Sequence, residues 1–260
     1  MKTVYHELQH GGQSILCCQC EEELCKALHS CRVVIGPTPF APDHTHLNGT
    51  PIPIWALTDL LTPRMHLLCG ALPRDIREEL VQKGIPYTDL MTDEGVAIKN
   101  AVATAEGLIA EIIRDTPYNL QGSRIAIIGY GRCGRCLAGK LRALGCEVTA
   151  VLRPGSPSAS FAWADGILVC LLEELPKRAC DILINTVPAV TVDLPLLLQT
   201  HPLELYDIAS LPGGFSEECK EVWKEHYHFL PGLPGRCSPK TSGEILAHKI
   251  QELLPYILSL

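Results

Sequence analysis

The chain has 260 residues, of which 47% are hydrophobic and 20% are charged, a composition typical of a globular protein with a buried core. Its formal net charge of −7 excludes a general affinity for nucleic acid or for an anionic membrane surface. No apolar run approaches the length of a membrane span, and the first residues lack the apolar core of a secretory signal. We therefore expect a cytoplasmic protein.

The first half of the chain predicts an irregular α/β domain with bounds at residues 1–95. Three strands are expected, in SILCC (14–18), RVVIG (32–36) and MHLLCG (65–70). Helices are expected in YHELQH, in EEELCKALH and at residues 73–83. Residues 36–63 are rich in Pro, Thr, His and Asp and predict a long loop, which inside a compact domain is usually functional or mobile.

Thirteen cysteines are many for a cytoplasmic protein. The default interpretation is reduced thiols that serve as small apolar side chains. CCQC, with Cys17, Cys18 and Cys20, lacks two paired C-x₂₋₄-C knuckles, so no metal site is predicted. Cys133 and Cys136 have C-x-x-C redox spacing, but they lie in a glycine-rich loop whose positions are constrained for another purpose.

The second half of the chain alternates strands with helices. Residues 93–115 first predict one long helix. The strands that follow are expected at 124–128, 147–152, 166–170, 180–186, 203–209 and 226–230, and the helices at 132–144, 172–178, 192–199, 217–225 and 241–258. Such alternation implies right-handed crossovers and a parallel sheet.

The segment RIAIIGYGRCGRC places Gly129, Gly131 and Gly134 in G-x-G-x-x-G spacing. It follows a predicted strand and opens a predicted helix, the context of a dinucleotide-binding loop. In such loops the first glycine permits the tight turn, the second lets the backbone approach the pyrophosphate, and the third allows close helix packing. The helix N-terminus then offers free amides to the phosphates. Arg132 and Cys133 belong to the same loop, and we expect them to contact the cofactor.

The next strand ends in VLRPGS, where NAD-binding units usually carry an acid for the adenosine ribose. Arg153 stands there, and no acid follows before Asp165. An arginine offers a fork of donors to a 2′-phosphate, and Ser156 and Ser158 can add hydroxyl groups. NADP is therefore predicted rather than NAD. The alternative is that Arg153 is a solvated surface residue.

Three later loops follow predicted strands, at the sheet edge where doubly wound folds bind ligands. NTVPA contributes Thr186, Val187 and Pro188, which we expect on the nicotinamide ribose side. By the same reasoning, Ala209 in ASLPGG and Pro234 in PGLPG are expected beside the cofactor.

Residues at the start of the last helix are candidates for anion binding. In SPKTSGE, Thr241 and Glu244 predict a capping box, and Lys240 precedes them. Helix N-termini favour anions, so Lys240, Thr241 and Ser242 are expected to hold a substrate carboxylate or a cofactor phosphate. The alternative is an ordinary helix cap beside a solvated lysine.

The segment NAVATAEG places Asn100, Thr104 and Glu106 in the long helix. Asn100 and Thr104 are four apart and share a face, which we expect to line the substrate cleft; ordinary helix positions are the alternative. Histidine is a common general base near neutral pH, so His44 and His46 are candidates for that role. A loop histidine is usually only solvated, however, so the catalytic residues stay unknown.

The predicted fold class is α/β with two domains. Residues 96–245 are expected to form a C-terminal Rossmann-type doubly wound parallel sheet that binds NADP. The smaller N-terminal domain is expected to be a flavodoxin-like α/β substrate domain. Residues 246–260 are expected to form a helix that packs back near the interdomain region.

Five motifs occur in order: VAIKNAVATAEG, IAIIGYGRCG, DILINTVPA, DIASLPGG and PGLPGRCSPKTSGEILA. Over roughly residues 85–260 this succession resembles the A subunits of dipicolinate synthases. The resemblance implies a substrate domain followed by a dinucleotide domain, an architecture related to D-2-hydroxyacid dehydrogenases and adenosylhomocysteinases. It also implies a further strand and glycine-containing turn ahead of YHELQH, so we expect an N-terminal domain that lacks the family's first strand.

The resemblance further implies an NADP-dependent oxidoreductase that acts on a CH–CH bond. It would oxidise dihydrodipicolinate, derived from 4-hydroxy-tetrahydrodipicolinate of the lysine/diaminopimelate pathway, to dipicolinate in the mother cell during sporulation. A flavoprotein-like B subunit is the implied partner, the substrate is a small dicarboxylate, and an oligomer is expected. This chemistry requires fixed donors for two carboxylates and a ring held against the nicotinamide.

Two other functions stay open at this point. A D-2-hydroxyacid dehydrogenase needs a histidine after the last strand of the nucleotide domain. Only His248 follows that strand, well inside the final helix, which disfavours this function. The second alternative is a non-catalytic NADP-binding scaffold that docks the B subunit or senses NADP(H).

Overall fold

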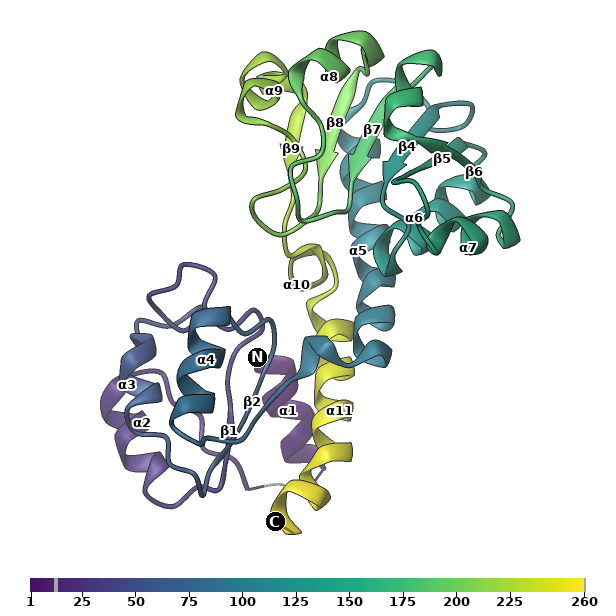
Figure 1. Cartoon of the computed structure of the whole chain (residues 1–260). Helices are drawn as coiled ribbons and strands as arrows, with labels where there is room; N and C mark the ends of the chain where they lie inside the picture. The colour runs from purple at the N-terminus through teal and green to yellow at the C-terminus, as the bar shows by residue number, and fades with distance from the viewer. Residues whose placement is uncertain (12–13, 260) are drawn as a thin grey trace. The chain divides into compact units, whose positions relative to one another are not determined.

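The structure is a computed structural model that describes residues 1–11 and 14–259. It divides into two compact units (Figure 1). Unit 1 contains Met1–Lys99 and Pro239–Leu260, and unit 2 contains Asn100–Ser238. The sequence placed these divisions at 95/96 and 245/246. The C-terminal helix belongs as a whole to unit 1.

Unit 1 is built on three parallel strands in the order β1-β2-β3. The strands are β1 (Val33–Ile35), β2 (His66–Cys69) and β3 (Tyr87–Asp89). Its helices are α1 (Lys2–His10), α2 (Glu21–Leu28), α3 (Ile54–Thr58), α4 (Arg74–Gln82), the first residues of α5 (Glu94–Asp115), and α11 (Pro239–Ser259), with a 3₁₀ turn at Leu90–Thr92. Apolar side chains of α2, α3 and α4 pack with Leu67 of β2, whereas those of α1 and α11 pack with Leu68. Successive residues of β2 therefore serve two separate cores.

The strand predicted at residues 14–18 is wrong. None of these residues joins a sheet, and Leu16 is 69% exposed. The run is apolar enough for a strand, but a strand forms only where a neighbour supplies hydrogen bonds. The third strand of the sheet is instead β3, whose sequence YTD is too short and polar to be recognised. The long loop predicted at residues 36–63 also contains the short helix α3.

Unit 2 is a parallel sheet of six strands in the order β6-β5-β4-β7-β8-β9. The strands are β4 (Arg124–Ile128), β5 (Glu147–Leu152), β6 (Leu168–Leu171), β7 (Ile182–Asn185), β8 (Glu204–Asp207) and β9 (Tyr227–Phe229). The order reverses at the central pair β4 and β7, as in the doubly wound sheets that bind dinucleotides. The structure thus confirms the predicted fold class.

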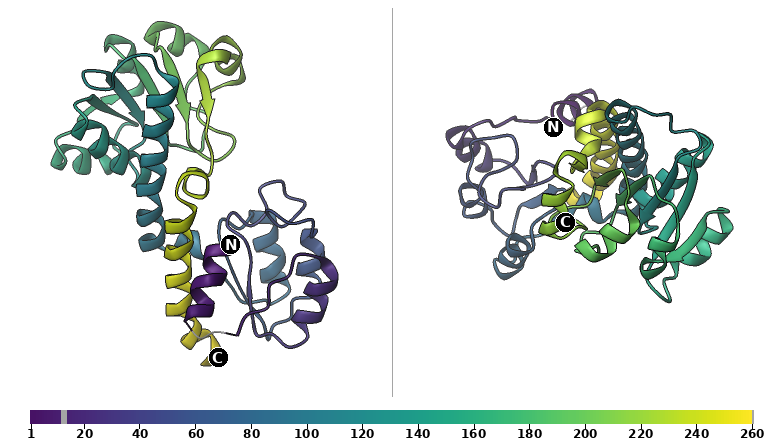
Figure 2. Two further views of the ribbon diagram at one scale, coloured as in Figure 1. Left: turned by 180° about the vertical axis from the view of Figure 1, so that it is seen from behind. Right: turned by 90° about the horizontal axis from the view of Figure 1, so that it is seen from above.

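Helices cover both faces of this sheet. They are the remainder of α5, α6 (Arg132–Ala143), α7 (Ser158–Ala164), α8 (Leu194–Thr200), α9 (Glu217–Val222) and α10 (Leu233–Cys237), with 3₁₀ turns at Leu172–Lys177 and Lys224–His226. In β4, Ile125 and Ile127 pack with α5 and α6, whereas Ala126 and Ile128 pack with α8 and α9. Figure 2 shows α5 lying across one face of the strands. Burial on both faces explains the continuous apolar run RIAII.

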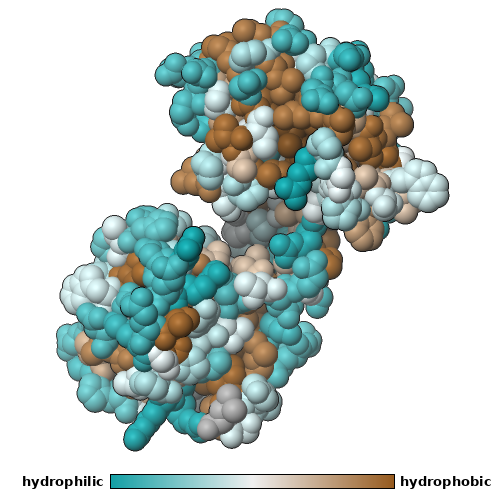
Figure 3. All heavy atoms as spheres, in the orientation of Figure 1, coloured by the Kyte–Doolittle hydropathy of each residue, from teal (hydrophilic) through white to brown (hydrophobic). Residues whose placement is uncertain are grey.

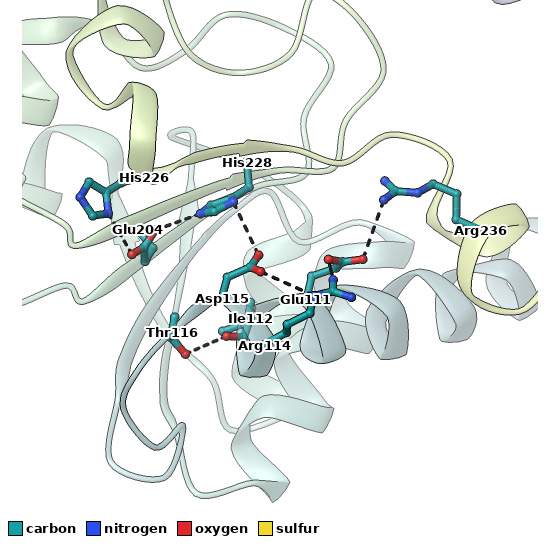
Figure 4. A network of polar contacts seen from close by, with 9 residues as sticks. All are labelled: Glu111, Ile112, Arg114, Asp115, Thr116, Glu204, His226, His228 and Arg236. Carbon is teal, nitrogen blue, oxygen red and sulfur yellow. Dashed lines mark hydrogen bonds and ion pairs between the residues drawn. The ribbon is translucent and has the colours of Figure 1, made fainter.

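An ionic cluster joins the end of α5 to the start of β8 and β9 (Figure 4). The buried carboxylate of Glu204 lies 3.0 Å from ring nitrogens of both His226 and His228. His228 also lies 3.6 Å from Asp115 and stacks on Tyr206 at 4.5 Å between ring centroids. The cluster stands at the amino edge of the sheet. The glycine loop follows the carboxyl end of β4, at the opposite edge, so we assign the cluster a structural role.

The surface of unit 2 combines charged and apolar areas. Figure 3 shows a broad hydrophobic area on its visible face, whereas the visible face of unit 1 is mostly hydrophilic. Within residues 1–11 and 14–259, no helix is both long enough and apolar enough to cross a bilayer.

Candidate cofactor site

Two of the loop glycines are required by packing within unit 2. Gly129 has φ +90°, and a Cβ there would lie 2.6 Å from Val187 Cγ2. A Cβ on Gly134 would lie only 2.3 Å from the carbonyl oxygen of Gly129. Any side chain at either position would therefore strain the turn between β4 and α6. This explains the first and third glycines without reference to a ligand.

Gly131 differs from both of these residues. It is the N-cap of α6, its backbone is extended, and beyond its two chain neighbours no described heavy atom lies within 4 Å of the position a Cβ would take. Space is thus left beside the first amides of a twelve-residue helix. A pyrophosphate requires this combination of close backbone approach, helix N-terminal amides and a positive dipole end. The residues present therefore fit a dinucleotide.

Arg153 directly follows β5, next to the glycine loop in strand order. Its side chain is exposed and forms no ion pair within the described part of the chain. The loop turns back at Gly155 (φ +70°), with Ser156 N donating to Arg153 O at 3.2 Å. Ser156 and Ser158 are half-buried. The guanidinium is thus available to an anion at the carboxyl edge of the sheet.

Asp165 is the first acid after Arg153, and it is already engaged. Arg135 donates to its two carboxylate oxygens at 2.7 and 3.0 Å. This guanidinium, with a further hydrogen bond from Tyr130, holds the pKa of Asp165 below its usual value. Three hydrogen bonds from within unit 2 thus already engage this carboxylate.

The loop after β7 is tied to the glycine loop. The backbone N–H and the hydroxyl of Thr186 both donate to Ile128 O, at 3.1 and 2.9 Å. Val187 is half-buried against Gly129, and Pro188 is exposed. Five predicted cofactor residues therefore lie at the junction of β4 and β7: Gly129, Gly131, Gly134, Thr186 and Val187.

The structure places the other predicted cofactor residues as follows. Arg132 and Cys133 occupy the first turn of α6. Burial raises the pKa of the Cys133 thiol, which is hydrogen-bonded to Thr104 of α5. Ala209 is buried after β8, and Pro234 lies in the first turn of α10.

The predicted substrate residues on α5 differ in burial and in the residues that they contact. Asn100 and Thr104 are buried, and the Thr104 hydroxyl donates to Asn100 O at 3.1 Å. Through Cys133, Thr104 also contacts the glycine-loop helix. Glu106 is exposed and paired with Lys140 of α6 at 2.8 Å. The structure therefore brings Thr104, but not Glu106, against the start of α6.

The residues Lys240, Thr241 and Ser242 belong to unit 1. The capping box predicted at Thr241 is wrong, because α11 begins at Pro239 and Thr241 lies inside its first turn. Lys240 is 83% exposed at the side chain and 3.8 Å from Glu244. Ser242 is buried, next to the point where α11 packs against α1.

The candidate bases and metal ligands can be placed as well. His44 and His46 are exposed in unit 1, where their ring nitrogens lie 3.6 Å from Asp75 and 3.4 Å from Asp43. His248, on α11, pairs with Glu252 at 3.3 Å. In the described ranges, no three His, Cys, Asp or Glu side chains are grouped to hold a metal ion.

Two polar residues at the carboxyl edge of unit 2 are not among the predicted site residues. Asn185 ends β7 and Asp207 ends β8, and both side chains are completely buried. Asn185 Nδ2 donates to Asp207 Oδ1 at 2.8 Å. The signal in the sequence was a polar residue closing each of two apolar strands, immediately before the predicted cofactor loops in NTVPA and DIASLPGG.

Comparisons with known proteins agree with this geometry. Residues 119–193 match the family model described as "Acetohydroxy acid isomeroreductase, NADPH-binding domain". Over 56 residues the chain is 52% identical to the ketol-acid reductoisomerase (NADP(+)) of Xanthomonas oryzae pv. oryzae, covering 22% of this chain and 17% of that protein. Unit 2 is therefore similar to the nicotinamide dinucleotide-binding domains of oxidoreductases.

A longer similarity connects the chain to one family. It is 34% identical over 171 residues to the A subunit of dipicolinate synthase from Bacillus subtilis, covering 65% of this chain and 57% of that protein. The crystal structure of the Bacillus subtilis protein superposes with a TM-score of 0.75 at 27% identity, over 88% of this chain and 79% of that one. The chain is thus similar to dipicolinate synthase A subunits in both sequence and fold.

Proposed function

We propose that this protein oxidises dihydrodipicolinate to dipicolinate with NADP⁺, as the A subunit of a dipicolinate synthase. The observation that carries the proposal is the open space at Gly131, directly before the amides of α6. It fits a dinucleotide in a chain whose fold is similar to that of the dipicolinate synthase of Bacillus subtilis. The matched segment spans just over half of that curated relative, so activity, substrate and partner are proposed here.

The reaction defines what the residues must do. Loss of water from 4-hydroxy-tetrahydrodipicolinate gives dihydrodipicolinate, and aromatisation then removes two hydrogens from the ring. One leaves as a hydride, for which bound NADP⁺ supplies the acceptor, and the other leaves as a proton. Because the aromatic product is strongly favoured, the main task of the protein is to hold the ring in position.

We assign the binding roles by chemistry. The backbone at Gly131 and the first amides of α6 would hold the pyrophosphate, and Arg153 with Ser156 would hold a 2′-phosphate. Thr186, Val187 and Pro188, with Ala209 and Pro234, would contact the nicotinamide half. Groups that can donate to a substrate carboxylate are the ammonium of Lys240 and the hydroxyls of Thr241 and Ser242 in unit 1. In unit 2 they are the amide of Asn100 and the hydroxyl of Thr104, with Glu106 also on α5.

Three observations support NADP⁺ over NAD⁺. Arg153 is exposed and forms no ion pair among the described residues, so its donors are available to a phosphate. Asp165, the next acid, is engaged by Arg135. The matching family model, over residues 119–193, is that of an NADPH-binding domain.

The partner that we propose is a flavoprotein-like B subunit. We also propose an oligomeric assembly and a role in sporulation in the mother-cell cytoplasm. The proposals of a partner, an oligomer and a sporulation role rest on the similarity to dipicolinate synthase A subunits.

The test supplies purified protein, with and without the B subunit, with 4-hydroxy-tetrahydrodipicolinate and NADP⁺. The ultraviolet bands of NADPH and of dipicolinate should rise together in equal amounts. Binding of NADPH without turnover in either mixture would instead indicate a cofactor-binding scaffold. Turnover of short 2-hydroxy acids would indicate a D-2-hydroxyacid dehydrogenase.

A further inference from the structure

A buried carboxylate links two loops at the carboxyl edge of unit 2. Asp207 Oδ1 accepts hydrogen bonds from Asn185 Nδ2 at 2.8 Å and from Ala209 N at 3.2 Å. Its Oδ2 accepts from Gly214 N at 2.8 Å and from the Tyr227 hydroxyl at 3.4 Å. One side chain thus receives four donors from three segments of the chain.

Asn185 extends this linkage into the loop after β7. Its Nδ2 donates to Val187 O at 2.9 Å, and its Oδ1 accepts from Val187 N at 3.1 Å. The amide therefore closes the turn that carries Thr186 and Val187 while it also donates to Asp207. Both residues are completely buried, so no solvent replaces a lost bond.

The glycines of the second loop fit the same centre. A Cβ on Gly213 would lie 2.5 Å from Asp207 Oδ2, and one on Gly214 would lie 2.1 Å from Asn185 Cγ. The backbone of residues 213–214 is therefore packed directly onto the two side chains. The backbone conformation of residues 213–214 therefore depends on the positions of the Asn185 and Asp207 side chains, and those positions depend on it.

We infer that Asp207, acting through Asn185, is a positioning residue that holds loops 186–189 and 208–214 in the conformation that binds the nicotinamide half of the cofactor. This inference rests on the proposed function. In a doubly wound sheet, one mononucleotide half follows β4 to β6 and the other follows β7 to β9. Loss of the Asp207 carboxylate should therefore weaken contacts to the nicotinamide half and spare the adenosine half.

The test compares two ligands in matched variants. NADPH carries both halves, whereas adenosine 2′,5′-bisphosphate carries only the phosphorylated adenosine. In Asp207→Asn the affinity for NADPH should fall between about fivefold and a hundredfold, since buried backbone donors lose their acceptor. The affinity for adenosine 2′,5′-bisphosphate should stay close to that of the unaltered protein.

Asp181→Asn is the matched control. Asp181 accepts from Arg124 N at 2.8 Å at the amino edge of the same sheet, so this variant loses stability without touching the loops. Hydrogen exchange of the ligand-free protein adds a readout independent of the cofactor. The amides of Ala209 and Gly214 should exchange faster in Asp207→Asn but not in Asp181→Asn.

Asn185→Ser keeps the inference testable if Asp207→Asn does not fold, because it removes the link between the loops and leaves the backbone donors on Asp207. It should show the same selective loss of NADPH affinity. An equal loss for both ligands, or NADPH affinity unchanged in both loop variants, would overturn the inference. If the unaltered protein binds neither ligand, the proposed cofactor is wrong, and the role inferred for Asp207 in binding it is wrong as well.

Discussion

The hydroxyl of Tyr130 donates to Asp165 Oδ2 at 2.9 Å, and this contact joins the glycine loop to the segment that follows α7. Tyr130 is the variable residue between Gly129 and Gly131, and it is buried rather than turned toward a ligand. Arg135 binds the same carboxylate and lies 5.1 Å from the centroid of the Phe161 ring. The side chain of Tyr130 thus fixes the glycine loop to the segment that follows α7.

Asp165→Asn should lower the thermal stability of the protein at neutral pH. The pKa of Asp165 is lower in the folded state than in the unfolded state. Its contribution to stability is therefore present above a pH of about 4 and is lost as the pH falls through the folded-state pKa. The difference in Tm between the variant and the unaltered protein should shrink when the pH is lowered below about 4. Thermal unfolding across a pH series measures it; a constant difference would contradict this role.

Arg153→Ala should weaken NADPH binding by about tenfold to a hundredfold, the effect of losing charge-assisted bonds to a phosphate. NADH binding should change little, so the preference between the two cofactors should collapse. Titration of NADPH and NADH fluorescence measures both affinities. Arg178→Ala, an exposed arginine at the amino edge of the same sheet, should leave the preference intact. An unchanged ratio in Arg153→Ala would remove the residue from the cofactor site.

Gly131→Ala and Gly134→Ala should fail for different reasons. At Gly131 the new methyl group meets no described atom within 4 Å beyond its chain neighbours, so Tm should be preserved while NADPH binding is lost. At Gly134 the methyl group would lie 2.3 Å from a backbone oxygen, a strain expected to cost about 1–3 kcal/mol. Calorimetry beside cofactor titration separates the two effects. Normal NADPH affinity in Gly131→Ala would argue against a pyrophosphate at this position.

Lys240→Ala should raise the KM for the dicarboxylate roughly tenfold or more, through loss of a cation that binds a carboxylate. Stability should hardly change, because the side chain is 83% exposed and 3.8 Å from its nearest acid. Lys249→Ala on the same helix is the control. It breaks a 2.8 Å ion pair with Asp93 and should affect stability rather than KM. A normal KM in Lys240→Ala would leave this lysine a surface residue.

Local signals explain why much of unit 2 could be predicted. Strands 124–128 and 147–152 were predicted with the bounds they have in the structure, because each is a short apolar run closed by polar or glycine residues. The spacing of Gly129, Gly131 and Gly134 is likewise a local requirement of one turn. The start of α11 carried a local signal that was overlooked, since proline is favoured at the first helical position, here Pro239.

The alternation of strands and helices in unit 2, the glycine loop and the arginine after β5 could be predicted, because each depends on residues close together in the chain. The roles of the individual site residues stay predictions. The folded structure was needed to show that residues 14–18 join no sheet, that Tyr130 and Arg135 bind Asp165, and that Asn185 contacts Asp207. These contacts join residues at least twenty positions apart, and such pairing follows from the packing of whole elements, which no local pattern encodes.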